Sequence, residues 1–201
     1  MVELYIVRHG ETDTNFTGKI NGSATDLNLN KTGRDQVNYL EKHLNINDFD
    51  EVYASPLKRA QETATILNQG VHEIKTDARL REINYGAWDG LVAADVHEKF
   101  PKCFDEHGYL TEDYSDYSKD AETYKSVIDR LQLFINDMAK KDDEKILVVC
   151  HGFVIRSFIQ LVTQAQNIED ILEPANAGVS KVTISKTGRT YLAYYNRLEN
   201  L

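Results

Sequence analysis

Two histidines follow short apolar segments at opposite ends of the chain, and each is followed directly by a glycine. The first lies in an Arg-His-Gly sequence at 8–10, after the segment 2–7, and the second lies in a His-Gly pair at 151–152, after the segment 146–150. A guanidinium beside an imidazole can bind an anion, and a glycine lets a ligand approach the backbone. A further cation, Arg59, lies near the start of an expected helix, where anions are favoured. These residues predict an anion pocket.

Short strands alternate with amphipathic helices, and these elements are expected to position the pocket. Segments 2–7 and 146–150 are rich in β-branched residues, as is typical of strands buried on both faces of a parallel sheet. Further strands are predicted at 51–54, 72–76, 179–185 and 190–195, the last two as a closing hairpin. Apolar residues recur at helical spacing around 37–44, 57–67 and 127–138. This order predicts an α/β fold with helices on the faces of a mostly parallel sheet, where ligands bind at the carboxyl ends of the strands.

The length and composition fit one globular enzyme-sized unit. The chain has 201 residues, of which 41% are hydrophobic and 27% are charged, so disordered and fibrous classes are excluded. We predict a single domain over 1–201. The segment from about 88 to 120 interrupts the alternation with Pro101, Gly108 and many acids, and is interpreted as an insertion, either a surface excursion or a lid over the site. The tyrosines at 109, 114 and 117 are expected on its surface.

The net charge, the apolar runs and the cysteines limit the expected partners, cellular location and metal content. A net charge of −9 disfavours binding to nucleic acid or to an anionic membrane. The apolar runs are far shorter than the roughly 20 residues of a membrane-spanning helix, and no signal peptide is visible, so a cytoplasmic location is expected. Cys103 and Cys150 lack metal-ligand spacing and are expected to be reduced thiols. We expect no metal and no cofactor, and the sequence gives no indication of the oligomeric state.

Five sequence features follow one another in an order that is highly specific for one protein family. They are Arg8-His9-Gly10-Glu11-Thr12, Asn15, Ser55-Pro-Leu-Lys-Arg59-Ala60-Gln-Glu-Thr63, Leu80-Arg-Glu82 with Gly86-Ala-Trp88-Asp-Gly90, and His151-Gly152. Together they closely resemble the histidine phosphatase superfamily, whose fold is phosphoglycerate mutase-like, and the resemblance spans nearly the whole chain. It implies a three-layer α/β/α sandwich with a mostly parallel central sheet and a lid-like insertion.

The resemblance also implies a role for each motif residue. His9 would be the nucleophile and become a phosphohistidine, and Glu82 would be the proton donor. The groups around the phosphoryl oxygens would be Arg8, Arg59, His151 and Asn15, with Gly152 also in the substrate-binding set.

Those roles agree with the chemistry of phosphoryl transfer. Negative charge spreads over three equatorial oxygens, so catalysis depends on positioning and on preorganised positive charge. His9 must offer a neutral nitrogen lone pair, and one carboxyl can protonate the leaving group and later activate water. Glu82 is preferred for this task, because Glu11 is interpreted as part of the first turn's structure.

The predicted function is metal-independent hydrolysis of a small phosphorylated substrate, with two alternatives. A phosphoglycerate mutase would need cations in the insertion, where only Lys99, Lys102 and Lys119 occur and no arginine. A catalytically silent phospho-ligand or protein-binding module would have lost a member of the catalytic set, which is intact here. The sequence does not identify the physiological substrate.

Overall fold

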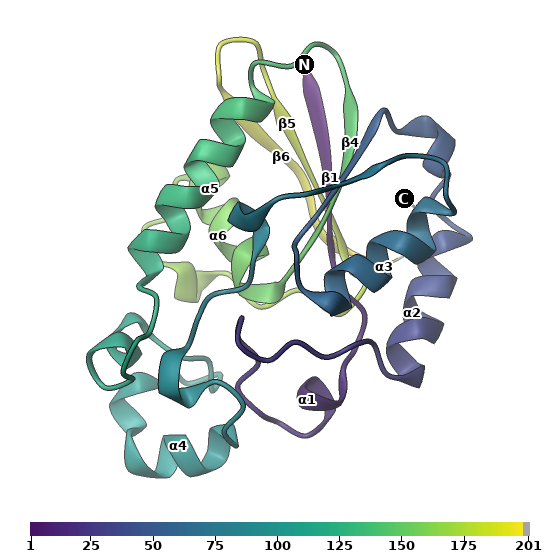
Figure 1. The fold of residues 1–201 in the computed structure, drawn as a ribbon. Coiled ribbons are helices and arrows are strands. Elements are labelled where there is room, and N and C mark those ends of the chain that lie inside the picture. The colour runs from purple at the N-terminus through teal and green to yellow at the C-terminus, as the bar shows by residue number, and fades with distance from the viewer. Residues whose placement is uncertain (199–201) are drawn as a thin grey trace.

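The computed structural model describes residues 1–198 and contains a six-stranded mixed sheet with the order β3-β2-β4-β1-β5-β6. The strands are β1 (Val2–Arg8), β2 (Glu51–Ala54), β3 (Ile74–Thr76), β4 (Lys145–Cys150), β5 (Val179–Ile184) and β6 (Thr190–Arg197). The first four are parallel to one another, whereas β5 and β6 form the antiparallel hairpin at one edge (Figure 1). The predicted α/β class and mostly parallel sheet are therefore confirmed.

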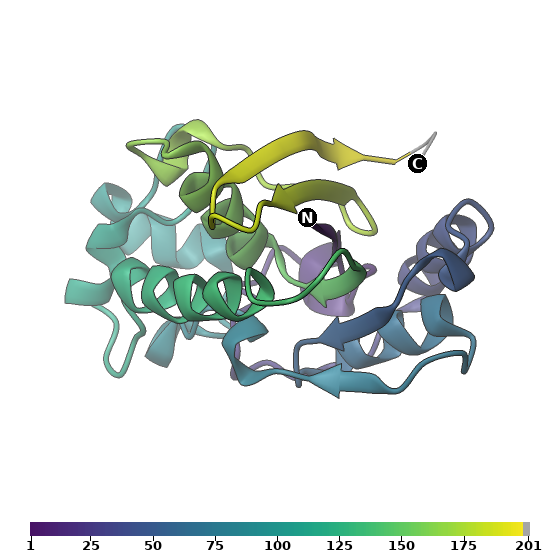
Figure 2. The ribbon, with the colours of Figure 1, turned by 90° about the horizontal axis from the view of Figure 1, so that it is seen from above.

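Helices cover both faces of the sheet, as Figure 2 shows from above. The helices are α1 (Asp13–Phe16), α2 (Lys31–Glu41), α3 (Lys58–Asn68), α4 (Ala93–Lys99), α5 (Tyr124–Met138) and α6 (Gly152–Thr163). Helices α2 and α3 pack on one face, and α5 and α6 pack on the other. Buried residues accordingly form two hydrophobic clusters, one on each side of the sheet. This arrangement is the expected three-layer sandwich.

The register of the central strands aligns the ends of three of them. Arg8 at the end of β1 pairs with Cys150 at the end of β4, and Ala54 at the end of β2 pairs with Val149. The hydrogen bonding continues one residue beyond the strands, because the His9 N–H donates to the carbonyl of Cys150. The segments that carry the sequence motifs thus leave the sheet side by side at its carboxyl edge.

The segment 88–120 is less exposed than its composition indicated. Besides α4, it contains the 3-10 turns Pro101–Cys103 and Glu112–Asp116. The expectation of surface tyrosines is wrong for Tyr114, which is completely buried, whereas Tyr117 is exposed. Tyr114 packs against Trp88 and Tyr85 with ring centroids 6.4 and 5.2 Å apart, so aromatic packing fixes the segment onto the rest of the fold.

One smaller difference concerns a strand boundary. Strand β3 begins at Ile74, two residues later than predicted from the apolar pattern. In the part of the chain that the structure describes, no helix combines the length and apolar character needed to span a membrane.

Candidate active site

His9 is buried at the carboxyl edge of the sheet, with both ring nitrogens engaged. Nδ1 lies 2.7 Å from the carbonyl oxygen of Gly10, which can only accept, so Nδ1 carries the proton. Nε2 then has a lone pair and accepts from Nε of Arg59 at 3.2 Å. Burial, followed by the positive charges of Arg59 and Arg8, holds the pKa of His9 well below its ordinary value. The ring is therefore neutral at physiological pH, and the electron pair on Nε2 accepts a hydrogen bond from Arg59.

Arg59 lies in the first turn of α3 and links two histidines. Its Nε also donates to Nδ1 of His151 at 3.2 Å, and its terminal nitrogens donate to the carbonyls of Gly22 and Thr25. The side chain is completely buried without a carboxylate among these hydrogen-bond partners. Such an arrangement keeps a positive charge beside His9 and available to an anion.

His151 has the opposite tautomer to His9. Because its Nδ1 accepts from Arg59, its Nε2 carries the proton and donates to the hydroxyl of Ser55 at 2.7 Å. The His9 and His151 ring centroids are 5.1 Å apart. Burial, followed by the charge of Arg59, holds the pKa of His151 well below its ordinary value. Ser55 was part of a sequence motif, but nothing in the sequence indicated that its hydroxyl orients His151.

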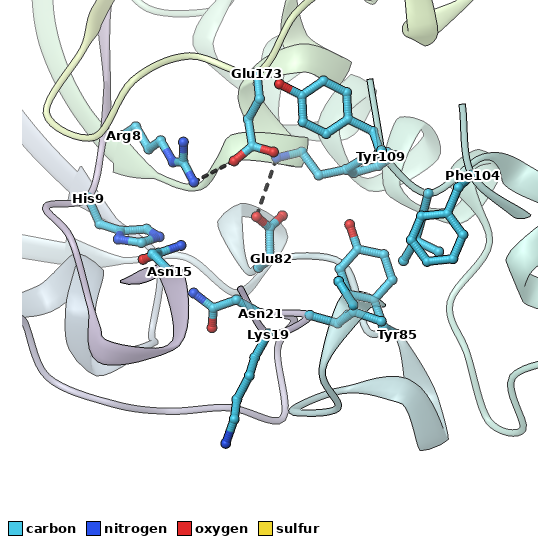
Figure 3. Close-up of a pocket in the computed structure, with 15 residues that line it drawn as sticks. Arg8, His9, Asn15, Lys19, Asn21, Glu82, Tyr85, Phe104, Tyr109 and Glu173 are labelled. Atoms are coloured by element: carbon cyan, nitrogen blue, oxygen red, sulfur yellow. Dashed lines mark hydrogen bonds and ion pairs between the residues drawn. The ribbon is translucent and has the colours of Figure 1, made fainter. Parts of the chain in front are cut away.

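Arg8 is the last residue of β1, and Figure 3 shows its side chain on the same side of the cavity as His9. Arg8 forms an ion pair with Glu173 and donates to the carbonyl of Pro174. Its buried Nε has no hydrogen-bond partner among the residues that the structure describes. Glu173 was missed in the sequence, because it lies in a loop without a motif and is brought to Arg8 by the return of the chain into β5 (Figure 3).

Glu82 is a buried carboxyl group on the floor of the site. Its two oxygens accept from the backbone N–H groups of Ile83 at 3.0 Å and Phe153 at 3.3 Å. Burial raises its pKa to about 7, although Arg59 opposes the shift. A carboxyl group with this pKa can exchange a proton in both directions near neutral pH.

Asn15 lies beside His9 in Figure 3, with its carbonyl side already bonded. Its Oδ1 accepts from the backbone N–H of Thr12 at 3.1 Å and from the Thr12 hydroxyl at 2.8 Å. These bonds orient the amide, so its NH₂ group is directed away from Thr12. Asn15 and His9 both line the cavity.

The two motif glycines make room for protein groups. A Cβ on Gly10 would lie 2.5 Å from the carbonyl oxygen of Gly33 in α2. The sequence predicted that a ligand approaches Gly10, but in the structure the group that approaches it is this helix. A Cβ on Gly152 would lie 2.6 Å from Oε1 of Glu173. Gly152 therefore lets the Glu173 carboxylate lie against the start of α6.

A cavity of about 170 Å³ opens at this site, and Figure 3 shows it with its lining side chains, among them Arg8, His9, Asn15, Glu82 and Glu173. Arg59 and His151 contact His9 or each other but are not among the lining residues. Arg8, His9 and Glu82 form its inner end. The segment 88–120 supplies part of the outer wall, through Phe104, Gly108, Tyr109 and Leu110. Tyr109, expected on the surface, is half-buried and lines this wall. Asn21 and Tyr85 also line the cavity and were not singled out in the sequence.

This fold and site are those of an α/β phosphotransfer enzyme, and comparison with known proteins gives the family. The histidine phosphatase superfamily (branch 1) matches residues 4–197, and the chain belongs to this superfamily. Phosphoglycerate mutase-like protein 4 of Arabidopsis thaliana is 35% identical over 175 residues, which cover 85% of this chain and 75% of the relative. Phosphoserine phosphatase 1 of Hydrogenobacter thermophilus is 30% identical over 159 residues, covering 78% and 74%.

Solved structures agree with this assignment. The protein YhfR of Bacillus stearothermophilus superimposes with a TM-score of 0.85 at 26% identity, covering 96% of both chains. Together with the phosphatase relatives, the family match makes this chain a phosphatase that acts on phosphomonoesters. The resemblance found in the sequence motifs is confirmed.

Proposed function

We propose that the chain hydrolyses small phosphomonoesters without a metal ion or cofactor, through a phosphohistidine at Nε2 of His9. The observation that carries this proposal is the neutral His9 ring. Its Nδ1–H is fixed on the Gly10 carbonyl, and its Nε2 lone pair lies beside the Arg59 guanidinium. A neutral nitrogen next to a fixed positive charge is suited to attack a phosphorus atom whose oxygens carry the negative charge.

In the first step, Nε2 of His9 attacks the phosphorus atom and the bond to the ester oxygen breaks. Glu82 gives its proton to this oxygen, which leaves as an alcohol. Arg8 and Arg59 supply N–H donors and positive charge to the transferring group, His151 acts beside them by holding Arg59 through Nδ1, and Asn15 directs its NH₂ group toward the phosphoryl oxygens. The guanidinium groups and the His151 ring are held by the contacts described above, so little reorganisation opposes the developing charge.

In the second step, water attacks the phosphohistidine and inorganic phosphate leaves. Glu82, now ionised, accepts a proton from the water, and His9 recovers its lone pair. The pKa of about 7 supports both roles, since protonated and ionised Glu82 are then present in similar amounts at neutral pH.

A mutase would have to retain the phosphoenzyme while the substrate reorients. The lysines of the segment 88–120 do not support this alternative, because Lys99, Lys102 and Lys119 are absent from the residues that line the cavity. A silent binding module is disfavoured by the complete catalytic set. We therefore propose that segment 88–120 is an insertion in a single domain and forms the outer wall of a hydrolase site.

The phosphoserine phosphatase among the relatives makes phosphoserine the first substrate to assay. The proposal is tested by measuring release of inorganic phosphate from a panel of phosphomonoesters, in parallel with a phosphoglycerate mutase assay. We expect hydrolysis that is abolished in His9→Ala and unaffected by chelators. Efficient isomerisation of phosphoglycerate with little hydrolysis would favour the mutase.

We also propose a cytoplasmic location, which the free, buried thiols of Cys103 and Cys150 support.

A further inference from the structure

The cavity contains a carboxylate to which the proposed mechanism gives no role, that of Glu173. Among the described residues that line the cavity, the acidic ones are Glu82 and Glu173 and the basic ones are Arg8 and Lys19. Glu82 is committed to proton transfer and Arg8 to the phosphoryl group. Lys19 is exposed, and Figure 3 shows its side chain extending away from the other labelled residues. Beyond the phosphoryl position, the remaining charged group of the cavity is therefore Glu173, whose Oε1 pairs with Arg8.

The Glu173 side chain is held by protein contacts but remains partly accessible from the cavity. Its Oε1 pairs with Arg8, and the carboxylate lies in the space left by the missing side chain of Gly152. The side chain is nevertheless 28% exposed, so it can contact a ligand in the cavity. Figure 3 shows it above Glu82, between Arg8 and Tyr109.

The position of Glu82 determines which part of a substrate meets Glu173. The ester oxygen must reach Glu82 to receive its proton, so the first atoms of the leaving group lie next to Glu82. Glu173 is close enough that its charge adds to burial in raising the pKa of Glu82. The same carboxylate therefore acts on charges carried by the first few atoms of the leaving group.

We propose that Glu173 is a specificity residue that selects phosphomonoesters with an amino group near the ester oxygen and disfavours those with a second anionic group there. A protonated amine next to Glu173 gains a charge-assisted hydrogen bond, whereas a carboxylate or second phosphate is repelled. This inference rests on the proposed function, because it places the leaving group between His9 and Glu82.

A purely structural role makes a different prediction. If Glu173 only orients Arg8, its loss weakens the contact between Arg8 and the phosphoryl group, and all substrates have that group. Activity would then fall by the same factor for every leaving group. Discrimination between leaving groups of different charge is therefore the readout that separates specificity from positioning.

The test uses three alkyl phosphates of similar size, namely 2-aminoethyl phosphate, propyl phosphate and phosphoglycolate. Their kcat/KM values are measured with the wild-type enzyme and with Glu173→Gln, and the ratio between the two enzymes cancels the intrinsic reactivity of each ester. Glu98→Gln on the exposed face of α4 is the matched control. Competitive inhibition of para-nitrophenyl phosphate hydrolysis by the same three compounds gives their binding order even where turnover is slow.

We expect Glu173→Gln to reduce the preference for 2-aminoethyl phosphate over phosphoglycolate by about tenfold or more, the scale of one charge contact. Propyl phosphate should change less, and Glu98→Gln should leave the preference unchanged. An unaltered preference in Glu173→Gln, or equal losses for all three compounds, overturns the inference. Neither result affects the proposed function, which is tested separately by whether para-nitrophenyl phosphate hydrolysis requires His9.

Discussion

The Nε atom of Arg59 lies 3.2 Å from Nε2 of His9, so the guanidinium directs an N–H at the ring nitrogen that we assign as the nucleophile. This contact requires Nε2 to be unprotonated, in agreement with the bond from Nδ1 to the Gly10 carbonyl. A phosphoryl group attached to Nε2 would lie against the same guanidinium. Arg59 therefore has two roles: it favours the His9 tautomer with an unprotonated Nε2, and it stabilises the phosphoryl group that His9 receives.

Replacement of Arg59 tests the second half of this relationship. Arg59→Ala should lower kcat/KM by about two to four powers of ten, the loss expected when a preorganised charge contact is removed. Arg59→Lys retains the charge without the planar fork and should lose less. Because Arg59 also bonds the carbonyls of Gly22 and Thr25, thermal unfolding must be measured on each variant. Near-normal kinetics in a folded Arg59→Ala protein would remove Arg59 from the mechanism.

Glu82→Gln should affect poor leaving groups much more than good ones. An alkyl phosphate leaves as a basic alkoxide that needs a proton, whereas para-nitrophenolate departs without one. The rate of His9 phosphorylation, measured in single turnovers, should collapse for the alkyl ester and persist in part for the aryl ester. Glu11→Gln is the control, since Glu11 accepts from Asn30 at 2.8 Å and is absent from the cavity lining. Equal losses for both esters in Glu82→Gln would exclude it as the general acid.

The pKa of Glu82 also predicts a pH dependence. Since burial raises this pKa to about 7, the protonated acid is abundant below pH 7 and is lost as the pH rises through that value. Phosphorylation by the alkyl ester should therefore decline above about pH 7 relative to phosphorylation by the aryl ester. Comparison of the two esters at each pH cancels ionisations that they share. A ratio independent of pH between 5 and 9 would contradict the assignment.

Ser55 is predicted to act by orienting His151. Ser55→Ala leaves the buried Nε2–H of His151 without its acceptor and should lower kcat/KM by about tenfold. Ser157→Ala is a matched control, because Ser157 is equally buried but donates to a carbonyl within α6. Ser55→Ala also removes the acceptor of the Leu57 N–H at 3.3 Å, so it should lose somewhat more stability than Ser157→Ala. Only Ser55→Ala should lose activity, with recovery in Ser55→Thr. Similar kinetics for the two alanine variants would show that Ser55 is structural.

The motif glycines are predicted to differ in their tolerance of a side chain. In Gly10→Ala the new Cβ meets the backbone carbonyl of Gly33, which cannot move without shifting α2, and the cost should be about 1–3 kcal/mol. In Gly152→Ala it meets the Glu173 side chain, which can move more easily than a helix backbone, although at the expense of its ion pair with Arg8. Denaturant unfolding should therefore show a large loss of stability for Gly10→Ala and a small one for Gly152→Ala. The reverse order would contradict these contacts.

Much of the inner site could be predicted from sequence because His9 and His151 directly follow strands and Arg59 lies in the first turn of the helix after β2. Parallel strands end at one edge of the sheet, so His9, Arg59 and His151 had to converge once β1, β2 and β4 were recognised. The pocket could not have been completed in this way. Glu173 and Tyr109 lie in loops without periodicity, and their positions depend on how the chain packs after the sheet has formed.

The role of Gly10 and the burial of Tyr114 show the same limit. A glycine after a strand indicates a close approach, but the sequence does not state whether the approaching group is a ligand or a helix. Tyr114 lies among acids that favour exposure, yet its ring packs against Tyr85 and Trp88, which are far from it in the chain. In both cases the outcome depends on tertiary contacts that the local sequence does not specify.

The covalent intermediate provides the most direct test of the account. Wild-type enzyme mixed with para-nitrophenyl phosphate is quenched within one turnover under alkaline conditions, digested and analysed by mass spectrometry. The account predicts phosphate on the peptide that contains His9, attached to the imidazole and released by acid, and no such species in His9→Ala. Phosphate on His151 or on any other residue, with turnover retained in His9→Ala, would contradict it.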